Sequence, residues 1–431
     1  MNTPLTHEMD DKRRDRITLL LAVISCFTVM NIYYNQPLLA LIGHNFGVSV
    51  TTASSIPSLT QLGFGLGIVL FVPLGDTIDR RWLILIKLVI VSGLLLLVGL
   101  APSLFFLAIL SFLLGVFTVI PQVSIPFAAQ LAPPDKRGRT IGIVMSGIFA
   151  GILISRALSG AAGNWFGWRA IFFAASVLML ILAAVVAKYL PHSGRSTQLN
   201  YWQVLQSLPG ILRREPVIQA ACVTGAFLFC VFSVFWSTLA FMLAAPPFRD
   251  GPWVAGILGL VGITGSAAAP IVGRMADRKG PAFTLGVSIA IAGVSSLVLV
   301  MFGKSMVGLI ASLILLDLGV QAGLVSNQTR IYSVLPPAYN SRVNTIFMSS
   351  YFTGGAVGSV LGGAVWDRFP SHTALGWLSA ALMLLAFLLH IGLQRRIRLT
   401  ALVPREVAVA AAVQATELSP KKLEIQSESS M

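Results

Sequence analysis

The chain has 431 residues, of which 56% are hydrophobic and only 11% are charged, and its formal net charge is +14. This composition excludes a soluble globular protein, and the length leaves no room for a large soluble domain beside the apolar segments. In a soluble chain the positive charge would suggest a nucleic-acid partner, but here the positions of the cations account for it, so we expect no nucleic acid.

About twelve long apolar stretches follow one another from Ile17 to Leu393, with short polar connectors between them. A membrane-crossing helix needs ~20 predominantly apolar residues, and the stretches are of about that length. The predicted spans are residues 17–42, 52–75, 82–100, 104–132, 140–162, 170–190, 217–244, 252–273, 282–303, 306–334, 340–364 and 372–394. We therefore expect an all-α polytopic membrane protein with the lipid bilayer as its surroundings.

The connectors alternate in charge. Lys and Arg are concentrated in the N-terminal segment and after the even-numbered spans, whereas the opposite connectors contain only Arg169, Arg249, Lys304 and Arg368. Because short loops rich in Lys and Arg stay cytoplasmic, both termini are predicted to be cytoplasmic in a multi-pass protein of the plasma membrane, the inner membrane of a bacterium. The N-terminal segment has no short apolar region with a small-residue cleavage site, so we expect the first helix to remain uncleaved.

The chain repeats itself at an offset of about 201–203 residues, which pairs Arg139 with Arg342 and Gly151 with Gly354. Two six-span halves related in this way form a transporter architecture, with the substrate site between them near the midplane. The predicted organisation is a cytoplasmic N-terminus (1–16), a first half (17–190), a cytoplasmic linker (191–216), a second half (217–394) and a disordered cytoplasmic tail (395–431). Within the linker, residues 201–212 are expected to form an amphipathic helix on the membrane surface.

The connector after the eighth predicted span fits the pattern Gly-x-x-x-Asp-Arg-x-Gly. It runs from Gly273 to Gly280, and Asp277 and Arg278 are its charged core. The connector after the second span has a related sequence around Asp76. With twelve spans in two halves, this motif resembles the loop signature of the major facilitator superfamily over essentially all of residues 17–394. The resemblance implies that fold and transport by alternating access, as in bacterial drug and sugar efflux-type members.

Several positions depart from the family pattern. In the first copy of the motif, Val72 stands where the leading Gly is expected, Thr77 where the Arg is expected and Asp79 where the second Gly is expected. In the fourth span Ser111 stands in place of the family's membrane arginine, and in the fifth span Arg156 occupies the last Gly position of the antiporter signature. The similarity to drug/proton antiporters therefore rests on architecture.

A carboxylate at a cytoplasmic helix end can pair with Arg and face the positive N-terminus of a neighbouring helix. Breaking and remaking such contacts can bias a rocking equilibrium between the halves. The predicted cytoplasmic gate consists of Asp76, Arg80, Arg81, Gly273, Asp277, Arg278 and Gly280. The alternative is that these charges only enforce topology.

Asp317, in the tenth span, is the one carboxylate deep within a predicted span, and Arg156, in the fifth, is the one cation at comparable depth. A charge there costs at least ~2.5–3.5 kcal/mol on insertion scales, so such residues usually pair or face a wet cavity. Asp317 is the candidate for proton coupling, and its alternative is a structural carboxylate held by hydroxyls or by Arg156. Arg156 is a candidate to bind an anionic substrate or to pair with Asp317. Lys87 lies near a span end and is expected to extend towards the membrane surface.

The first predicted span contains a cluster of amide and phenol groups beside Pro37, which is costly in hydrocarbon. In the superfamily that the chain resembles, the first, fourth, seventh and tenth spans line the central cavity. The substrate-cavity candidates are Tyr34, Asn35, Gln36, Gln122, Trp236, Gln321, Asn327 and Gln328. The alternative for each is a hydrogen bond that only holds neighbouring helices together.

No phosphate-binding loop of the Gly-x-x-x-x-Gly-Lys-Ser/Thr type is present, so transport driven by ATP is not expected. Nor does any nucleophile or metal-ligand pattern suggest an enzyme, and we expect no catalytic residue, no metal and no cofactor. The sequence predicts a monomeric secondary transporter that exports a small organic compound, with the proton gradient as energy source. The alternatives are an importer or uncoupled facilitator of the same fold, and a membrane receptor or assembly factor that does not transport.

Overall fold

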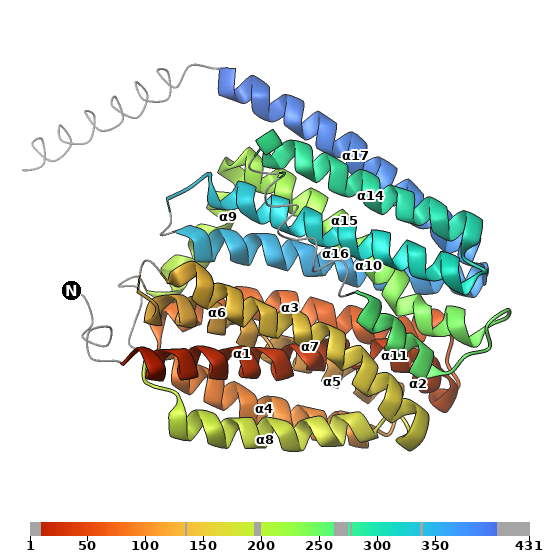
Figure 1. The fold of residues 1–431 in the computed structure, drawn as a ribbon, viewed down its shortest axis with the longest axis horizontal. Coiled ribbons are helices and arrows are strands. Elements are labelled where there is room, and N and C mark those ends of the chain that lie inside the picture. Colours follow the sequence, from red (N-terminus) through yellow and green to blue (C-terminus); the bar gives the residue numbers. More distant parts are fainter. Residues whose placement is uncertain are drawn as a thin grey trace, which may run out of the picture.

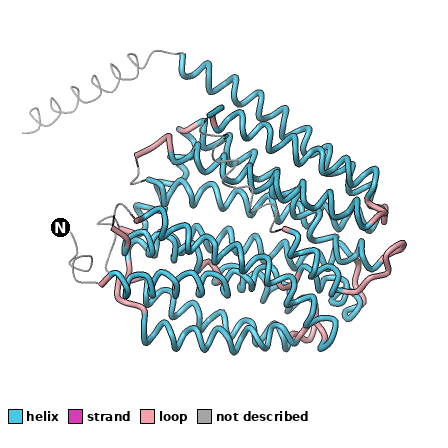
Figure 2. Tube along the Cα trace, viewed as in Figure 1, coloured by secondary structure: helices cyan, strands magenta, loops and turns pink. Residues whose placement is uncertain are grey.

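The computed structural model describes residues 10–133, 136–193, 200–262, 275, 278–336 and 339–402. In these ranges the regular secondary structure is helical throughout (Figure 2). Several helices extend a few residues beyond the predicted apolar spans into polar sequence; for example, α7 covers Arg137–Phe166 where residues 140–162 were expected.

The first half contains α1 (Asp11–Tyr33), α2 (Leu39–Phe46), α3 (Val50–Thr77), α4 (Arg80–Leu100), α5 (Leu104–Phe117), α6 (Ile120–Leu131), α7 (Arg137–Phe166) and α8 (Ala170–Tyr189). Two spans are interrupted. A 3-10 turn at Gln36–Leu38 separates α1 from α2, and a break at Thr118–Val119 separates α5 from α6. Pro37 and Pro121 lie at these breaks, where a residue without an N–H cannot continue the helical ladder.

The second half contains α10 (Pro216–Ala244), α11 (Pro252–Val261), α14 (Pro281–Phe302), α15 (Met306–Tyr332), α16 (Asn340–Arg368) and α17 (His372–Leu402). The linker helix expected at residues 201–212 is present as α9 (Tyr201–Arg214), which buries Val204 and Leu208 and exposes Trp202. The tail was expected to be disordered from residue 395, but α17 continues to Leu402, and the rest of the tail lies outside the described residues. The predicted eighth span also continues beyond the described part of α11.

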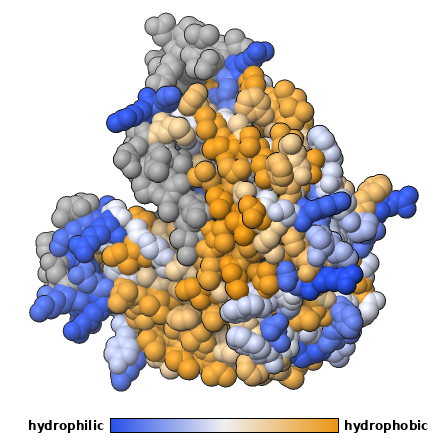
Figure 3. All heavy atoms as spheres, turned by 45° about the vertical axis from the view of Figure 1, so that its right-hand side comes forward, coloured by the Kyte–Doolittle hydropathy of each residue, from blue (hydrophilic) through white to orange (hydrophobic). Residues whose placement is uncertain are grey.

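Ten segments of the described chain are long and apolar enough to cross a membrane. α11 and α16 complete the predicted set of twelve; α16 is long enough, at 29 residues, but is rich in Gly, Ser and Thr. Apolar side chains cover the middle of the face shown in Figure 3, and hydrophilic side chains gather towards its margins. The prediction of an all-α polytopic membrane protein is therefore confirmed.

The two halves lie side by side, the first in the lower part of Figure 1 and the second in the upper part. They contact each other mainly along two helix pairs, α3 with α16 and α7 with α11. A buried core within the first half is separate from a second core that fills the second half and extends to first-half residues such as Tyr33 and Phe64. The seam between the halves is thus where a site shared by both would lie.

Candidate functional site

A cavity of about 490 Å³ lies between the two halves. Its wall is formed by α1, α3, α6 and α7 from the first half and by α10, α15 and α16 from the second. Eight of the wall residues are aromatic: Tyr33, Phe64, Phe149, Phe229, Phe232, Tyr332, Tyr351 and Phe352. Its amides are Gln122, Gln321, Gln328, Asn340 and Asn344. Among the described residues, none that lines the cavity is charged.

The cavity extends to one end of the bundle. Tyr332 at the end of α15 and Asn340 at the start of α16 belong to its wall, as does Val72 near the end of α3. These helix ends carry the connectors rich in Lys and Arg, so the cavity reaches the face predicted to be cytoplasmic. In the other direction it ends at Tyr33, the last residue of α1, and at Phe232, in the interior of α10.

The opposite, predicted outer end is closed by contacts between the halves. A Cβ atom added to Gly160 of α7 would lie 2.5 Å from the carbonyl oxygen of Pro252 and 2.9 Å from the Cα atom of Gly256, both in the α11 region. The Asp367 carboxylate, near the end of α16, accepts hydrogen bonds from the backbone N–H groups of Val50 (2.9 Å) and Thr51 (2.8 Å) in the first turn of α3. The helix dipole of α3 favours the negative charge at this position.

Arg156 is buried beneath the closed end of the cavity, with 1% of its surface exposed. Its Nε donates a hydrogen bond to Gln36 Oε1 (3.0 Å), and its guanidinium carbon lies 3.5 Å from the ring centroid of Trp236. The same carbon is 5.3 Å from the ring centroid of Tyr33 and 5.5 Å from that of Phe232, two rings of the cavity wall. Arg156 therefore lies directly behind the wall rather than in it.

Asp317 is buried in α15, with 5% of its surface exposed, and is close enough to Arg156 for electrostatic interaction. The two are not within salt-bridge distance in the described structure, and Asp317 Oδ1 has no hydrogen-bond partner among the described residues. Both pack against α11 and the residue after it. A Cβ on Gly259 would lie 2.5 Å from Arg156 Cβ, and one on Gly262 would lie 2.5 Å from Asp317 Oδ2. Asp317 is one helical turn from the wall residues Val320 and Gln321, on the side of the closed end.

Of the eight cavity candidates, the structure places Gln122, Gln321 and Gln328 in the wall. The other five are buried behind it. Gln36 and Trp236 contact Arg156 as described, Tyr34 packs edge-to-face against Phe172 of α8, Asn35 donates a hydrogen bond to Thr60 Oγ1 (3.3 Å), and Asn327 accepts one from Thr224 Oγ1 (3.3 Å).

The sequence reasoning missed most of the aromatic wall and the amides at the start of α16. Tyr33, the neighbour of the predicted Tyr34, lines the cavity because consecutive helical residues point about 100° apart. Asn340 and Asn344 lie four residues apart and so share one helix face. Their spacing is a signal that could have identified them, because polar side chains repeating on one face of a membrane span usually face protein or water.

At the predicted cytoplasmic end, Asp76 bridges the two halves. Its Oδ1 lies 2.8 Å from Arg80 Nη2, and its Oδ2 accepts a hydrogen bond from Ser341 Oγ (3.0 Å) in the first turn of α16. Arg80 also donates to Gln130 Oε1, and Arg81 donates to the carbonyl oxygen of Ala187. A carboxylate at a helix end, paired with Arg and facing another helix N-terminus, is the arrangement that the sequence analysis expected of a gate.

Asp79, which replaces the second Gly of the motif, begins α4 and anchors the start of the linker. It accepts hydrogen bonds from the backbone N–H groups of Arg81 and Ser193 (3.0 Å each), and its other oxygen lies 2.5 Å from His192 Nδ1. Partial burial favours the neutral carboxyl, but these hydrogen bonds outweigh it and hold the pKa of Asp79 below its ordinary value.

In the second copy of the motif, Gly273 and Asp277 lie outside the described residues. Arg278 is exposed at the start of the described segment that leads to α14. Gly280 precedes α14 with φ of 85°, a backbone conformation that favours glycine. The backbone conformation at Gly280 is therefore enough to explain why the pattern ends in glycine.

Lys87 does not extend to the membrane surface, and that expectation was wrong. Its side chain is buried, with 1% of its surface exposed, and its ammonium nitrogen lies 3.3 Å from the ring centroid of Phe71 and 5.7 Å from that of Phe117. Cation–π attraction to these rings holds it between α3, α4 and α5, where no described side chain accepts a hydrogen bond from it.

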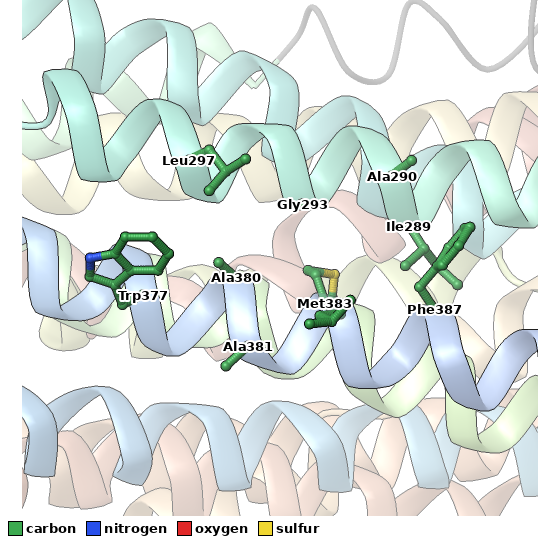
Figure 4. A pocket seen from close by; sticks show the side chains of 10 residues that line it. Ile289, Ala290, Gly293, Leu297, Trp377, Ala380, Ala381, Met383 and Phe387 are labelled. Atoms are coloured by element: carbon green, nitrogen blue, oxygen red, sulfur yellow. The ribbon is translucent and has the colours of Figure 1, made fainter.

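A second hollow of about 510 Å³ lies between α14 and α17 (Figure 4). Apart from the indole N–H of Trp377, its lining side chains are apolar, among them Leu297, Met383 and Phe387. Trp377 and Leu384 are exposed on a part of the surface formed by two spans, so this hollow faces the lipid. It offers few groups to recognise a polar solute.

A helical membrane bundle of two related halves, with a cavity between them that reaches one face, defines a solute transporter. The sequence profile of the Major Facilitator Superfamily matches residues 21–358 and 250–421, and the chain belongs to this superfamily. The resemblance seen in the loop motif is thereby confirmed.

Relatives support the same class. The chain is 37% identical to the uncharacterized transporter YgaY of Escherichia coli O157:H7, over 82% of this chain and 89% of YgaY. A more distant relative, the chloramphenicol resistance protein of Streptomyces lividans, is 26% identical over 62% of this chain and 68% of that protein. Among solved structures, a bacterial homologue of the human lysosomal transporter Spinster, inward-facing and occupied, matches with a TM-score of 0.73 at 16% identity, over 90% of this chain and 98% of that one. That likeness concerns the fold alone.

Proposed function

We propose that this transporter works by alternating access and exports a small organic compound in exchange for protons. The proton gradient across the plasma membrane supplies the energy, no cofactor takes part, and a monomer with both termini in the cytoplasm is the working unit. Asp317 carries the proton. The cavity receives the compound, and Asp76 with Arg80 and Arg81 biases the cytoplasmic gate.

The observation that supports proton coupling best is the buried pair of Asp317 and Arg156 beyond the closed end of the cavity. Protonation of Asp317 changes the net charge of this pair from zero to +1. In a medium of low effective dielectric constant, one added charge alters the electrostatic energy strongly. Because both side chains pack against Gly259 and Gly262 without spare room, the proton can bias how closely α7, α11 and α15 approach one another.

The cavity reaches the face predicted to be cytoplasmic and is closed at the other, so a cytoplasmic compound has access to it in this conformation. Importers and exporters both pass through such a conformation, so the export direction rests on a relative. The Streptomyces lividans relative bears the name of a chloramphenicol resistance protein. Resistance to a compound is a phenotype expected of an exporter, and chloramphenicol is accordingly the first probe to use.

The test compares everted membrane vesicles that contain the wild type, Asp317→Asn or Asp15→Asn, with a dye that reports the pH gradient. Asp15 is an exposed acid at the start of α1 and serves as the matched control. We expect chloramphenicol, or another compound from a panel of drugs, sugars and organic acids, to dissipate the gradient with the wild type and Asp15→Asn only. If the wild type and Asp317→Asn move the compound down its gradient equally fast and the dye responds with neither of them, the protein is an uncoupled facilitator. If folded, inserted wild type moves no compound of the panel, the exporter proposal fails.

A further inference from the structure

We infer that the transported compounds are uncharged and aromatic, and that they carry polar groups which hydrogen-bond to side-chain amides. This inference rests on the proposed function, because it assigns a chemical class to the compound that the same cavity receives. Three features of the wall support it: its rings, its free amides, and its lack of charge beside a buried cation.

The rings of the second half form a continuous aromatic surface that meets the first half. Phe229 stacks on Tyr351 with ring centroids 4.2 Å apart, and Phe352 lies edge-on to Phe229 at 5.1 Å. Phe352 also packs against Phe64 of α3 at 4.5 Å. An aromatic ligand adds one more ring to such a cluster by offset stacking or edge-to-face contact.

Three of the five amides of the wall are free to bind a ligand, whereas Asn344 accepts a hydrogen bond from Tyr332. The side chains of Gln122 on α6 and of Gln321 and Gln328 on α15 form no hydrogen bond with another residue in the described part of the chain. Each amide presents both donors and an acceptor. Amides in an otherwise apolar wall suit hydroxyl, carbonyl and amide groups, which need partners once they leave water.

The electrostatics of the wall disfavour charged compounds. A charged ligand would lose hydration without gaining an opposite charge in the wall. The buried cation behind the wall, Arg156, is already bound to Gln36 and stacked on Trp236, behind the ring of Tyr33. When Asp317 holds a proton, the buried pair is positive. It then attracts an anion, so an anion would travel with the proton rather than against it, whereas a cation is disfavoured by its loss of hydration in the uncharged wall. An uncharged compound avoids both conflicts, and a volume of about 490 Å³ suits a small organic molecule.

The first experiment measures binding to the full chain in lipid nanodiscs by isothermal titration. The probes are phenyl, naphthyl and indolyl amino-acid derivatives in three charge forms: the uncharged N-acetyl amide, the anionic N-acetyl acid and the cationic trimethylammonium amide. We expect the uncharged member of at least one scaffold to bind roughly tenfold or more tightly than its two charged counterparts. Tighter binding of a charged form on every scaffold, or no binding by any member, overturns the inference.

The second experiment changes the wall. Gln321→Leu removes one free amide and should weaken binding of the uncharged probe about fivefold to thirtyfold. The matched control is Gln206→Leu on the exposed side of α9, which should leave binding unchanged. Gln321→Glu keeps the size and adds a negative charge, so it should reverse the preference in favour of the cationic probe. An unchanged order of preference in Gln321→Glu shows that the wall does not select by charge.

The experiments can refute the proposed proton exchange and the proposed chemical class independently of each other. If the uncharged probe binds but its movement leaves the pH gradient intact, the chemical class stands and proton exchange falls. If an organic acid dissipates the gradient through Asp317 while the uncharged probes do not bind, proton coupling stands and the chemical class falls.

Discussion

The outer closure depends on the glycine crossing of α7 and α11, and Gly160→Ala tests it directly. The added Cβ would lie 2.5 Å from the carbonyl oxygen of Pro252 and 2.9 Å from the Cα atom of Gly256. Both are backbone atoms, so no side-chain rotation can relieve the overlap and the two helices have to separate. We expect Gly160→Ala to shift the protein towards conformations that are open on the outer side.

The magnitude follows from the cost of overpacking, which is typically ~1–3 kcal/mol per site. The overlap exists only where α7 and α11 are in contact, so the whole cost falls on the closed conformation. A bias of this size changes the ratio of open to closed molecules by about fivefold to 150-fold.

The assay is a spin-label distance measurement across the outer face. Labels at His44→Cys in the first half and Lys304→Cys in the second, with Cys26, Cys222 and Cys230 replaced by alanine, report the separation of the halves in membranes. We expect Gly160→Ala to increase the population at longer distances.

Two further glycines provide controls. A Cβ on Gly67 would lie even closer to a backbone oxygen, that of Val116, but this contact lies within the first half. Gly67→Ala should therefore lower the unfolding temperature without changing the distances. Gly93→Ala, whose Cβ meets nothing within 4 Å, should change neither. If Gly160→Ala leaves the distance distribution as in the wild type, the glycine crossing does not hold the outer side closed.

Three other predictions concern single side chains. Asp367→Ala should increase the outward-open population about fivefold, because loss of a side chain that caps a helix N-terminus costs ~1 kcal/mol. An unchanged distance distribution from the same spin labels would contradict this. Lys87→Met should leave the unfolding temperature unchanged or raise it. The variant loses a cation–π contact of ~0.5–2 kcal/mol, but removal of a buried charge offsets that loss. A fall of several degrees in the unfolding temperature would contradict this. Folding lowers the pKa of Asp79, so the ionised Asp79 stabilises the folded protein. This stabilisation is complete at a pH above the ordinary pKa of an aspartate. It is lost as the pH falls through the lower pKa that Asp79 has in the folded protein. Asp79→Asn should therefore be less sensitive to acid in unfolding-temperature measurements between pH 6 and pH 3, which span the ordinary carboxyl pKa, and an identical pH profile would argue against the role of Asp79.

The sequence was sufficient to predict the spans, the two halves and the linker helix, because each depends on local length, hydropathy and repetition. It also indicated Asp76 as a residue facing a helix N-terminus, since a motif carries that information. It could not decide which face of a span turns inward. Tyr34 was expected in the cavity and Tyr33 lines it, and nothing in the local pattern distinguishes two adjacent tyrosines.

Contacts between residues that are far apart in the chain also could not be predicted from the sequence. Asp79 looked only like a departure from a family motif, and its role depends on Ser193, 114 positions later. Lys87 looked like a residue near a span end, but its burial depends on how Phe71 and Phe117 from two other helices come together. Such partners become visible only when the helices are placed in space.

The helix pair α3 and α16 is closed at both ends at once. Asp76 near the end of α3 contacts the first turn of α16, while Asp367 near the end of α16 contacts the first turn of α3. The cavity nevertheless reaches the cytoplasmic face, where Val72, Tyr332 and Asn340 line it. The contact of Asp76 with Ser341 is therefore present while the cavity is open to this face. A compound that enters from the cytoplasmic side passes beside a helix pair that is joined at both of its ends.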